Sequence, residues 1–262
     1  MSDALLSAEA ISMRFGGVVA LDEVDLHVGP SSITGLVGPN GAGKTTLFGI
    51  LSGLTRPRGG RVVFDGADIT AASPQRRARL GLARTFQRLE LFSELTVRDH
   101  LVVARRVRER RDRTFLRDLI GIGSQPSPGE DDAVDALLDL LGLGSVADRV
   151  AARIPLGTGR IVELARALAT EPRLVLLDEP TSGLDAHETE HVADALRTAC
   201  EDRGVAFVLV EHDVELVLRL CEDVTVLDFG RVIAHGPPTA IRASADVQAA
   251  YLGAAPAGQD VP

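Results

Sequence analysis

The strongest constraint on the fold of this chain is a nine-residue stretch, GPNGAGKTT, at positions 38–46. It follows an apolar run, 33–37, and precedes a helix-like segment, 47–54, so its glycines fall where a strand would turn into a helix. The pattern G-x-x-x-x-G-K-[ST] needs this context to form a phosphate-binding loop, in which backbone N–H groups and the positive end of a helix face one anion. The alternative is a glycine-rich turn with an exposed lysine.

Lysine usage supports the phosphate-binding interpretation. The chain has 28 lysine and arginine residues, and Lys44 is its only lysine. A compact ammonium fits between phosphates inside a tight backbone loop, whereas the planar guanidinium of arginine does not. We therefore expect Lys44 to reach the β- and γ-phosphates of a nucleotide, and the Thr45 hydroxyl to bind Mg²⁺.

Composition excludes several classes of protein. The net charge of −9 and the pI of about 5.2 argue against a general nucleic-acid binder, which needs cations to neutralise phosphates. Cys200 and Cys221 have no CxxC spacing, so neither a zinc site nor a disulfide framework is expected, and a reducing cytoplasm fits best. The first 15 residues do not resemble a secretory signal, and no apolar run approaches the roughly 18 residues of a membrane span.

Short apolar strands alternate with helices over much of the chain. Wholly apolar strands indicate a parallel sheet covered by helices on both faces, and two N-terminal strands separated by Gly16-Gly17 precede it. The expected strands are 10–15, 24–28, 33–37, 61–64, 82–86, 174–177, 205–210, 224–227 and 231–234, and the expected helices are 47–54, 74–80, 131–141, 160–169 and 186–203.

The pattern changes between residues 89 and 152. Thr96 to Asp99 resembles a capping box, and the helix it begins runs into a tract with seven arginines between Arg105 and Arg117. The tract is either a solvated helix face or a surface for lipid headgroups or an acidic partner. We expect an ATP-binding core at 1–88 and 153–253, a helical subdomain at 89–152 and a disordered tail at 254–262.

Two apolar strands end in polar residues suited to phosphate chemistry. Asp178 and Glu179 follow the strand 174–177, at the end where ligands bind in an open parallel sheet. Asp178 is placed to hold the Mg²⁺ shared with Thr45, and Glu179 to polarise a water for attack on the γ-phosphate. His212 follows the next strand and could bind the γ-phosphate or fix that water, although a lone histidine at a strand end is more often structural.

These motifs resemble the ATP-binding subunits of ABC transporters over roughly residues 5–253. The resemblance rests on the loop 38–46 as Walker A, Gln87 as the Q-loop, LVLLDE at 174–179 as Walker B, and SGLD, ending in Asp185, as the D-loop. His212 matches the switch histidine. Phe15 matches the aromatic that stacks on adenine, whereas its position alone would fit a core residue equally well.

Within that family, RTFQRLELFSELTVRDHL, the insertion after it, and the ending AAYLG are similar to the longer ATPase of branched-chain amino-acid importers. The resemblance implies an α/β P-loop NTPase with a mostly parallel sheet, N-terminal antiparallel strands and a helical insertion. It also implies that ATP and Mg²⁺ bind, with Gln87 and His212 assisting Glu179 in catalysis and Gln87 joining Thr45 and Asp178 at the metal. The implied nucleotide ligands are Phe15, Gly38, Asn40, Gly41, Gly43, Lys44, Thr45 and Thr46.

The sequence departs from the family at its signature motif, LSGGQ. The aligned residues are 154–158, in which Pro155 replaces the serine that donates to the partner's nucleotide and Leu156 replaces the first glycine. Loss of one such donor costs on the order of 2.7–4 kcal/mol in the transition state. The resemblance places Pro155, Gly157, Thr158 and Asp185 at a head-to-tail interface between two ATPases. We therefore expect two unequal sites in a heterodimer, with a homodimer as the alternative.

The leading interpretation is an energy-coupling ATPase that lies peripherally on the inner face of the plasma membrane. Its implied partners are permease subunits, contacted through Gln87 and the segment 89–152, a second ABC ATPase, and indirectly an extracytoplasmic solute-binding protein, with no nucleic acid. One alternative is a soluble ABC ATPase of repair or translation, but the chain has neither a second cassette nor a long coiled-coil insertion. Another is a nucleotide-binding regulatory module, against which the presence of Glu179 argues.

Overall fold

The computed structural model describes residues 4–85, 89–109 and 129–252. Within it the chain forms two compact units. Unit 1 contains residues 1–74 and 206–262, and unit 2 contains residues 75–205. The expected division into a core and a helical subdomain groups the same elements differently and stays a prediction.

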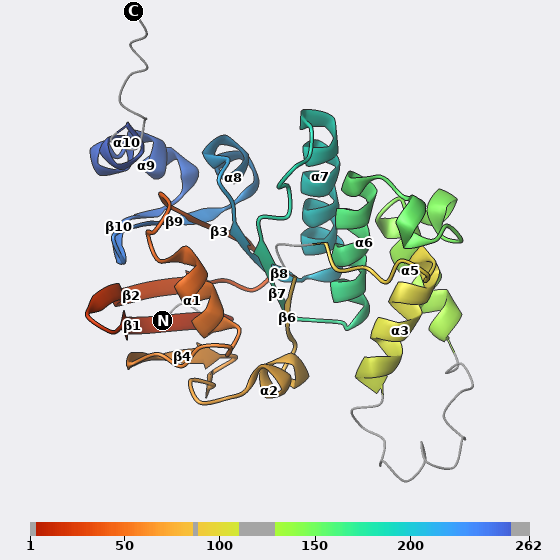
Figure 1. Ribbon diagram of the computed structural model, residues 1–262, viewed down its shortest axis with the longest axis horizontal. Coiled ribbons are helices and arrows are strands. Elements are labelled where there is room, and N and C mark those ends of the chain that lie inside the picture. Colours follow the sequence, from red (N-terminus) through yellow and green to blue (C-terminus); the bar gives the residue numbers. More distant parts are fainter. Residues whose placement is uncertain (1–3, 86–88, 110–128, 253–262) are drawn as a thin grey trace, which may run out of the picture. The chain divides into compact units, whose positions relative to one another are not determined.

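Unit 1 contains an antiparallel sheet with the strand order β2-β1-β4-β5. Its two long strands, β1 (Leu6–Phe15) and β2 (Val18–Val28), alternate buried and exposed residues, as expected for a sheet with one covered face. Both begin well before the residues where we expected them. The shorter strands are β4 (Gly59–Phe64) and β5 (Ala67–Asp68). Figure 1 shows these strands beside helix α1 (Lys44–Leu51).

A second set of strands in unit 1 has the order β10-β9-β3-β8. In this set β3 (Ile33–Val37) pairs in parallel with both β8 (Ala206–Val210) and β9 (Asp223–Asp228), and β10 (Arg231–Gly236) closes it as an antiparallel edge. Every residue of β3 and β8 is buried, which confirms the prediction from their predominantly apolar sequences.

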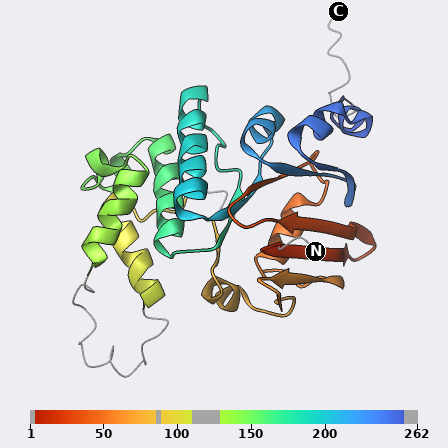
Figure 2. The same ribbon diagram turned by 180° about the vertical axis from the view of Figure 1, so that it is seen from behind.

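Three short helices of unit 1 were not predicted: α8 (Val214–Leu220), α9 (Pro238–Ala243) and α10 (Ala245–Leu252). A Cβ built on Gly35 of β3 would lie 2.4 Å from Val217 of α8, so this glycine lets the helix pack closely on the strand. Helices α9 and α10 follow the β9–β10 hairpin and lie next to each other (Figures 1 and 2).

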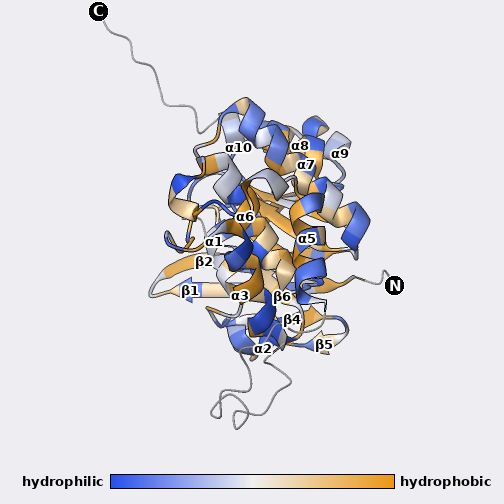
Figure 3. Ribbon diagram, turned by 90° about the vertical axis from the view of Figure 1, so that its right-hand side faces the viewer, coloured by the Kyte–Doolittle hydropathy of each residue, from blue (hydrophilic) through white to orange (hydrophobic). Residues whose placement is uncertain are grey.

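Unit 2 contains the parallel pair β6 (Leu82–Arg84) and β7 (Leu174–Asp178), preceded by α2 (Pro74–Arg79). Its helices α3 (Val97–Glu109), α5 (Glu130–Leu140), α6 (Leu156–Ala169) and α7 (Ala186–Arg203) pack side by side (Figures 1 and 2). Short 3₁₀ turns, Gly144–Val146 and Ala151–Arg153, join α5 to α6. Figure 3 shows hydrophobic residues on the strands and hydrophilic ones on α2.

The expected helix caps are present in the structure. Thr96 accepts a hydrogen bond from the Asp99 N–H at 3.1 Å, and Asp99 accepts one from the Thr96 N–H at 3.1 Å, which closes the capping box before α3. Asp185 forms a second box with Glu188 at the start of α7, and Gly204 ends that helix in the left-handed conformation.

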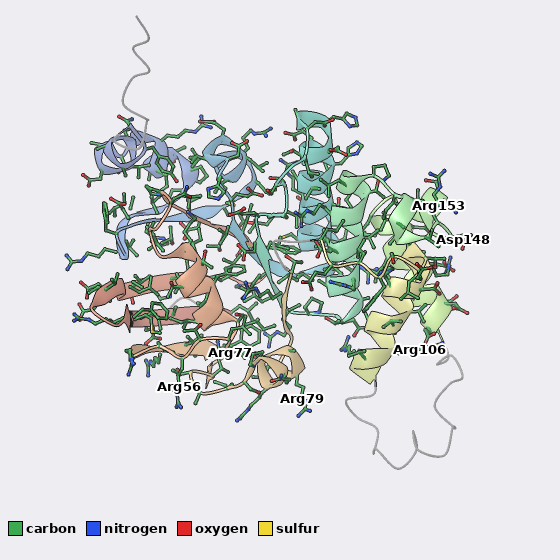
Figure 4. The ribbon with its side chains drawn as sticks, viewed as in Figure 1. Arg56, Arg77, Arg79, Arg106, Asp148 and Arg153 are labelled. Carbon is green, nitrogen blue, oxygen red and sulfur yellow. The ribbon has the colours of Figure 1, made fainter. Side chains whose placement is uncertain are left out.

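The described arginines of the basic tract pair with acidic residues of unit 2. Arg106, labelled in Figure 4, donates to both carboxylate oxygens of the buried Glu130, and Arg105 and Arg108 form ion pairs with Glu171. The rest of the tract, Arg110 to Arg117, lies outside the described residues, as do the tail at 254–262 and residues 121–128 of a glycine- and proline-rich loop expected at 121–130. The last residue of that expected loop, Glu130, instead begins α5. Among the helices that the structure describes, none has both the length and the hydropathy to span a membrane.

Candidate functional site

The loop between β3 and α1 has the backbone geometry expected of a phosphate-binding loop. Gly38, Gly41 and Gly43 have φ values of 152°, 82° and 106°, a region that residues with a Cβ rarely adopt. A Cβ on Gly38 would lie 2.1 Å from the Leu227 carbonyl oxygen, and one on Gly43 would lie 2.7 Å from the Ala20 carbonyl oxygen. Both conformation and space therefore require glycine at these two positions.

Lys44 folds back over this loop. Its ammonium donates to the Gly38 carbonyl oxygen at 2.5 Å and to the Pro39 carbonyl oxygen at 3.1 Å, and the residue is only 7% exposed. Helix α1 has no side-chain cap at its N-terminus and no acidic residue in its first turn. The loop thus gathers a buried cation and uncapped helix N–H groups around one place, which suits a polyphosphate.

The other predicted ligands of unit 1 include His212, Thr45 and Phe15. Because β8 and β3 pair in parallel, with Val210 opposite Leu36, His212 follows β8 at the same sheet edge at which the loop follows β3. His212 and Thr45 are both exposed. Phe15 ends β1 with 53% of its surface exposed, so its ring is available for stacking on a base rather than buried in the core.

Unit 2 carries the predicted carboxylates at the end of β7. Asp178 is 8% exposed and forms an ion pair with Arg84, at 3.2 Å between Nη2 and Oδ2, from the neighbouring strand β6. Glu179 follows with a φ of 49°, in the left-handed region. Such a conformation costs about 1–2 kcal/mol in a residue with a side chain, and strain of this kind occurs at active sites as well as in turns.

Magnesium is the metal that the resemblance implies, and each predicted donor, taken by itself, has chemistry that suits it. Thr45 supplies a hydroxyl and Asp178 a carboxylate, which are the hard oxygen ligands that Mg²⁺ uses together with waters and substrate phosphates. Among the described residues no group of three or more His, Cys, Asp or Glu side chains could hold a metal ion by itself. Gln87, the third predicted ligand, lies outside the described residues.

The segment that aligns with the signature motif begins helix α6. The helix starts at Leu156, four residues earlier than we predicted, because Pro155 occupies the N-cap with extended backbone and has no N–H to satisfy. Gly157 is buried and donates its N–H to Glu188 at 3.3 Å, while Leu156 remains 42% exposed. A Cβ on Gly183 would touch Leu156 at 3.4 Å, so the D-loop and the signature segment lie together.

Helix α6 also holds the chain that follows the Q-loop position. Arg166 donates to the Glu90 carbonyl oxygen at 2.6 Å, and the Glu90 N–H donates to Glu163 at 3.4 Å. Burial raises the pKa of Glu163, against the opposing effects of the Glu90 N–H, Arg160 and Arg166. These hydrogen bonds attach the segment that begins at residue 89 to α6, the helix that starts in the segment aligned with the signature motif.

Sequence reasoning missed two residues that contact the predicted site residues: Arg84 and Glu188. Glu188 could have been found, because it stands three residues after Asp185 in a capping-box pattern. Arg84 lies 94 residues from Asp178, so no local pattern connects the two residues.

Comparison with protein families identifies the chain. Residues 21–182 match the family described as ABC transporter, and residues 231–257 match the one described as Branched-chain amino acid ATP-binding cassette transporter. This chain belongs to the ABC transporter ATP-binding family. Membership confirms the predicted fold class and the resemblance to the ATP-binding subunits of ABC transporters, and the 38–46 loop lies within the matched residues.

Several relatives match nearly the whole cassette. It is 36% identical over 260 residues to the high-affinity branched-chain amino acid transport ATP-binding protein LivG of Escherichia coli (strain K12), covering 97% of this chain and 100% of LivG. It is 35% identical to BraF of Pseudomonas aeruginosa, with the same coverage. Among solved structures, the ADP conformation of the ATP-binding cassette MJ1267 superimposes with a TM-score of 0.82 at 28% identity, covering 95% of this chain and 99% of that one.

Proposed function

We propose that this cassette hydrolyses Mg²⁺-bound ATP to drive uptake of a branched-chain amino acid or a similar small solute. In this role it lies on the cytoplasmic face of the membrane, joins permease subunits and a second ABC ATPase, and serves a solute-binding protein on the other side. The observation that carries the proposal is the match of residues 231–257 to the branched-chain amino acid cassette family, together with full-length similarity to LivG and BraF.

The roles of the residues follow from their chemistry. The backbone N–H groups of the 38–46 loop and Lys44 hold the β- and γ-phosphates, and Lys44 exchanges its two carbonyl partners for phosphate oxygens when the nucleotide arrives. Thr45, Asp178 and Gln87 would hold Mg²⁺, which supplies charge neutralisation on the phosphates. Phe15 stacks on the base.

Glu179 is the general base for the attacking water. Its strained backbone fixes the carboxylate at the end of β7, and His212 and Gln87 orient the γ-phosphate and the water. We also propose that residues 1–88 and 153–253 act as the ATP-binding core and residues 89–152 as the helical subdomain that meets the permeases.

The two nucleotide sites of the assembled dimer are expected to be unequal. Pro155 offers no donor to a partner's γ-phosphate, Leu156 adds bulk, and the Gly157 N–H is bonded to Glu188. A partner with an ordinary signature would complete the site built on this chain's Walker residues, whereas this chain would complete the partner's site poorly.

The test of hydrolysis uses Glu179→Gln, which keeps the shape of the side chain and removes its basicity. With Mg²⁺ and ATP, the wild-type cassette in complex with its partner ATPase should release phosphate, and the variant should retain ATP unhydrolysed, with turnover at least about 100-fold lower. Equal turnover of the two would exclude Glu179 as the base. A wild type that binds ATP but never hydrolyses it would indicate a regulatory module instead.

Two further measurements test the assembly. Brisk, cooperative hydrolysis by the purified chain alone would contradict the unequal sites. Reconstitution of the cassette with its permeases, partner ATPase and binding protein in vesicles should give ATP-dependent uptake of radiolabelled leucine, isoleucine or valine, and uptake that is the same with wild-type and Glu179→Gln cassettes would reject the coupling role.

A further inference from the structure

The turn between β9 and β10 is hydrogen-bonded to the phosphate-binding loop. In that turn, the Gly230 N–H donates to the Ala42 carbonyl oxygen at 3.0 Å, and a Cβ built on Gly43 would lie 3.6 Å from the Gly230 Cα. Figures 1 and 2 show the β9–β10 hairpin next to β2, which it contacts through β10. All of these residues belong to unit 1, so the contact lies within one compact unit.

Strand β2 holds this turn in place. The Asp22 N–H donates to the Gly230 carbonyl oxygen at 2.8 Å, and the Asp22 carboxylate accepts two hydrogen bonds from Arg231, at 3.0 Å from Nε and 2.6 Å from Nη2. Gly230 has a φ of 79°, and a Cβ there would lie 2.7 Å from the Ala20 carbonyl oxygen. The loop therefore binds the N–H of Gly230, β2 binds its carbonyl oxygen, and only glycine fits between them.

The bond to Ala42 fixes the orientation of the peptide that joins Ala42 to Gly43. This peptide is trans, and a trans peptide is planar, with its C=O and N–H on opposite sides of the chain. Because Gly230 holds the carbonyl oxygen, the Gly43 N–H faces away from the β9–β10 turn. Gly43, with a φ of 106°, does not restrict the peptide by itself, since glycine adopts many backbone conformations. The Gly230 N–H thus determines the direction of the Gly43 N–H.

We infer that Gly230 is a positioning residue for nucleotide binding, and that its N–H holds the Ala42–Gly43 peptide so that the Gly43 N–H can donate to a phosphate. Gly43 occupies the N-cap of α1, directly before the uncapped first turn of that helix and the buried Lys44. Gly230 touches neither phosphate nor metal in this role and acts through the loop. If the peptide were not held, the nucleotide would have to orient it on binding, which weakens affinity.

The test compares two glycines that have nearly the same backbone conformation. Gly230→Ala places a Cβ against the Ala20 carbonyl oxygen and displaces the turn from the loop. Gly66→Ala is the matched control, because Gly66 has a φ of 74° and its Cβ would meet nothing within 4 Å. Loss of one hydrogen bond to a charged phosphate should raise the Kd for ADP roughly 10- to 100-fold in Gly230→Ala. The Kd of Gly66→Ala should stay within about twofold of the wild-type value.

Calorimetry with inorganic pyrophosphate shows which part of the nucleotide is affected. Pyrophosphate has no base, so a misdirected phosphate donor should raise its Kd by the same factor as the Kd for ADP. A rise for ADP alone would place the effect at the base and overturn the inference. An ADP Kd of Gly230→Ala within about threefold of the wild-type value, or an equal rise in Gly66→Ala, would overturn it too.

Amide hydrogen exchange tests the same contact in the wild-type chain, and it decides the question if Gly230→Ala fails to fold. Without nucleotide, the Gly230 N–H should exchange at least about tenfold more slowly than in the urea-unfolded chain, because it is bonded to Ala42. If this N–H exchanged freely in the nucleotide-free chain and became protected only with bound ADP, the nucleotide would be what orders the peptide. That result would reject the role of Gly230.

This inference rests on nucleotide binding by the proposed ATPase, and the measurements distinguish the two failures. A wild-type chain that binds ADP, together with an unchanged Kd in Gly230→Ala, rejects the role of Gly230 and leaves the ATPase intact. A wild-type chain that binds neither ADP nor pyrophosphate by calorimetry rejects the proposed function and this inference together.

Discussion

The proposed catalytic base occupies a strained backbone position, so its replacement by glycine should separate stability from activity. Glu179 has a φ of 49°, and Pro180 and a hydrogen bond from the Ser182 N–H to the Glu179 carbonyl oxygen at 3.1 Å enclose it in a tight turn. Glycine adopts this conformation without the steric cost that a Cβ imposes. The comparison is made between Glu179→Gly and Glu179→Gln, both of which lack the base.

The expected difference in stability follows from two opposing terms. A side chain in the left-handed region costs about 1–2 kcal/mol, which Glu179→Gln keeps and Glu179→Gly removes. Replacement by glycine also lowers the free energy of unfolding by about 0.5–1 kcal/mol, because the unfolded chain of the glycine variant has more conformational freedom. The net gain of the glycine variant is about 0.5–1 kcal/mol. With an m-value of about 3 kcal/mol/M in urea, that gain moves the midpoint upward by about 0.2–0.3 M.

The assay is urea unfolding without nucleotide, followed by circular dichroism, with phosphate release measured on the same preparations. Phe229→Gly is the matched control, because Phe229 has a φ of 41°, is 87% exposed and lies in the β9–β10 turn. It should raise the midpoint by a similar amount and retain hydrolysis. A Glu179→Gly midpoint at or below that of Glu179→Gln, while Phe229→Gly rises, would refute the assignment of strain to Glu179.

Two further predictions concern the ends of the helices. Asp185→Ala removes the cap that accepts from the Glu188 N–H at 2.8 Å and should lower the free energy of unfolding by about 1 kcal/mol, measured by urea titration with Asp194→Ala as an exposed control on the same helix. Burial raises the pKa of Tyr251 to about 12, so absorbance at the tyrosinate band should show no ionisation near pH 10.5 in the folded chain and more than half in urea. Because the folded pKa lies above the unfolded one, stability from this residue is complete below pH 10 and falls as pH rises from 10 to 12.

The parts of the fold that sequence predicted well are those with strong local signals. The strands β3, β7 and β8 come from predominantly apolar runs, and α7 begins at a capping box and ends at Gly204. Helices α8, α9 and α10 have six to eight residues, too few turns for a clear helical period, and none was predicted.

In the candidate site, too, local sequence features were predicted and long-range contacts were not. The loop at 38–46 carries its chemistry in consecutive residues, so its conformation could be predicted, including the need for glycine at positions 38 and 43. Contacts such as that of Arg84 with Asp178, or of Glu188 with Gly157, join residues far apart in sequence and depend on the packing of whole elements. Periodicity and motif spacing contain no information about such pairs.

At the start of α6, a local sequence feature and a long-range contact act on the same backbone N–H groups. A helix normally caps its first N–H groups with a side chain at the N-cap, and Pro155 cannot do so. The Glu188 carboxylate, from another helix, accepts the Gly157 N–H instead, while its other oxygen accepts the Asp185 N–H at 3.3 Å. One carboxylate thus joins the segment that aligns with the signature motif to the D-loop. In the unequal-site dimer that we propose, this negative charge and the missing donor at Pro155 are both expected to weaken the site that this chain completes for its partner.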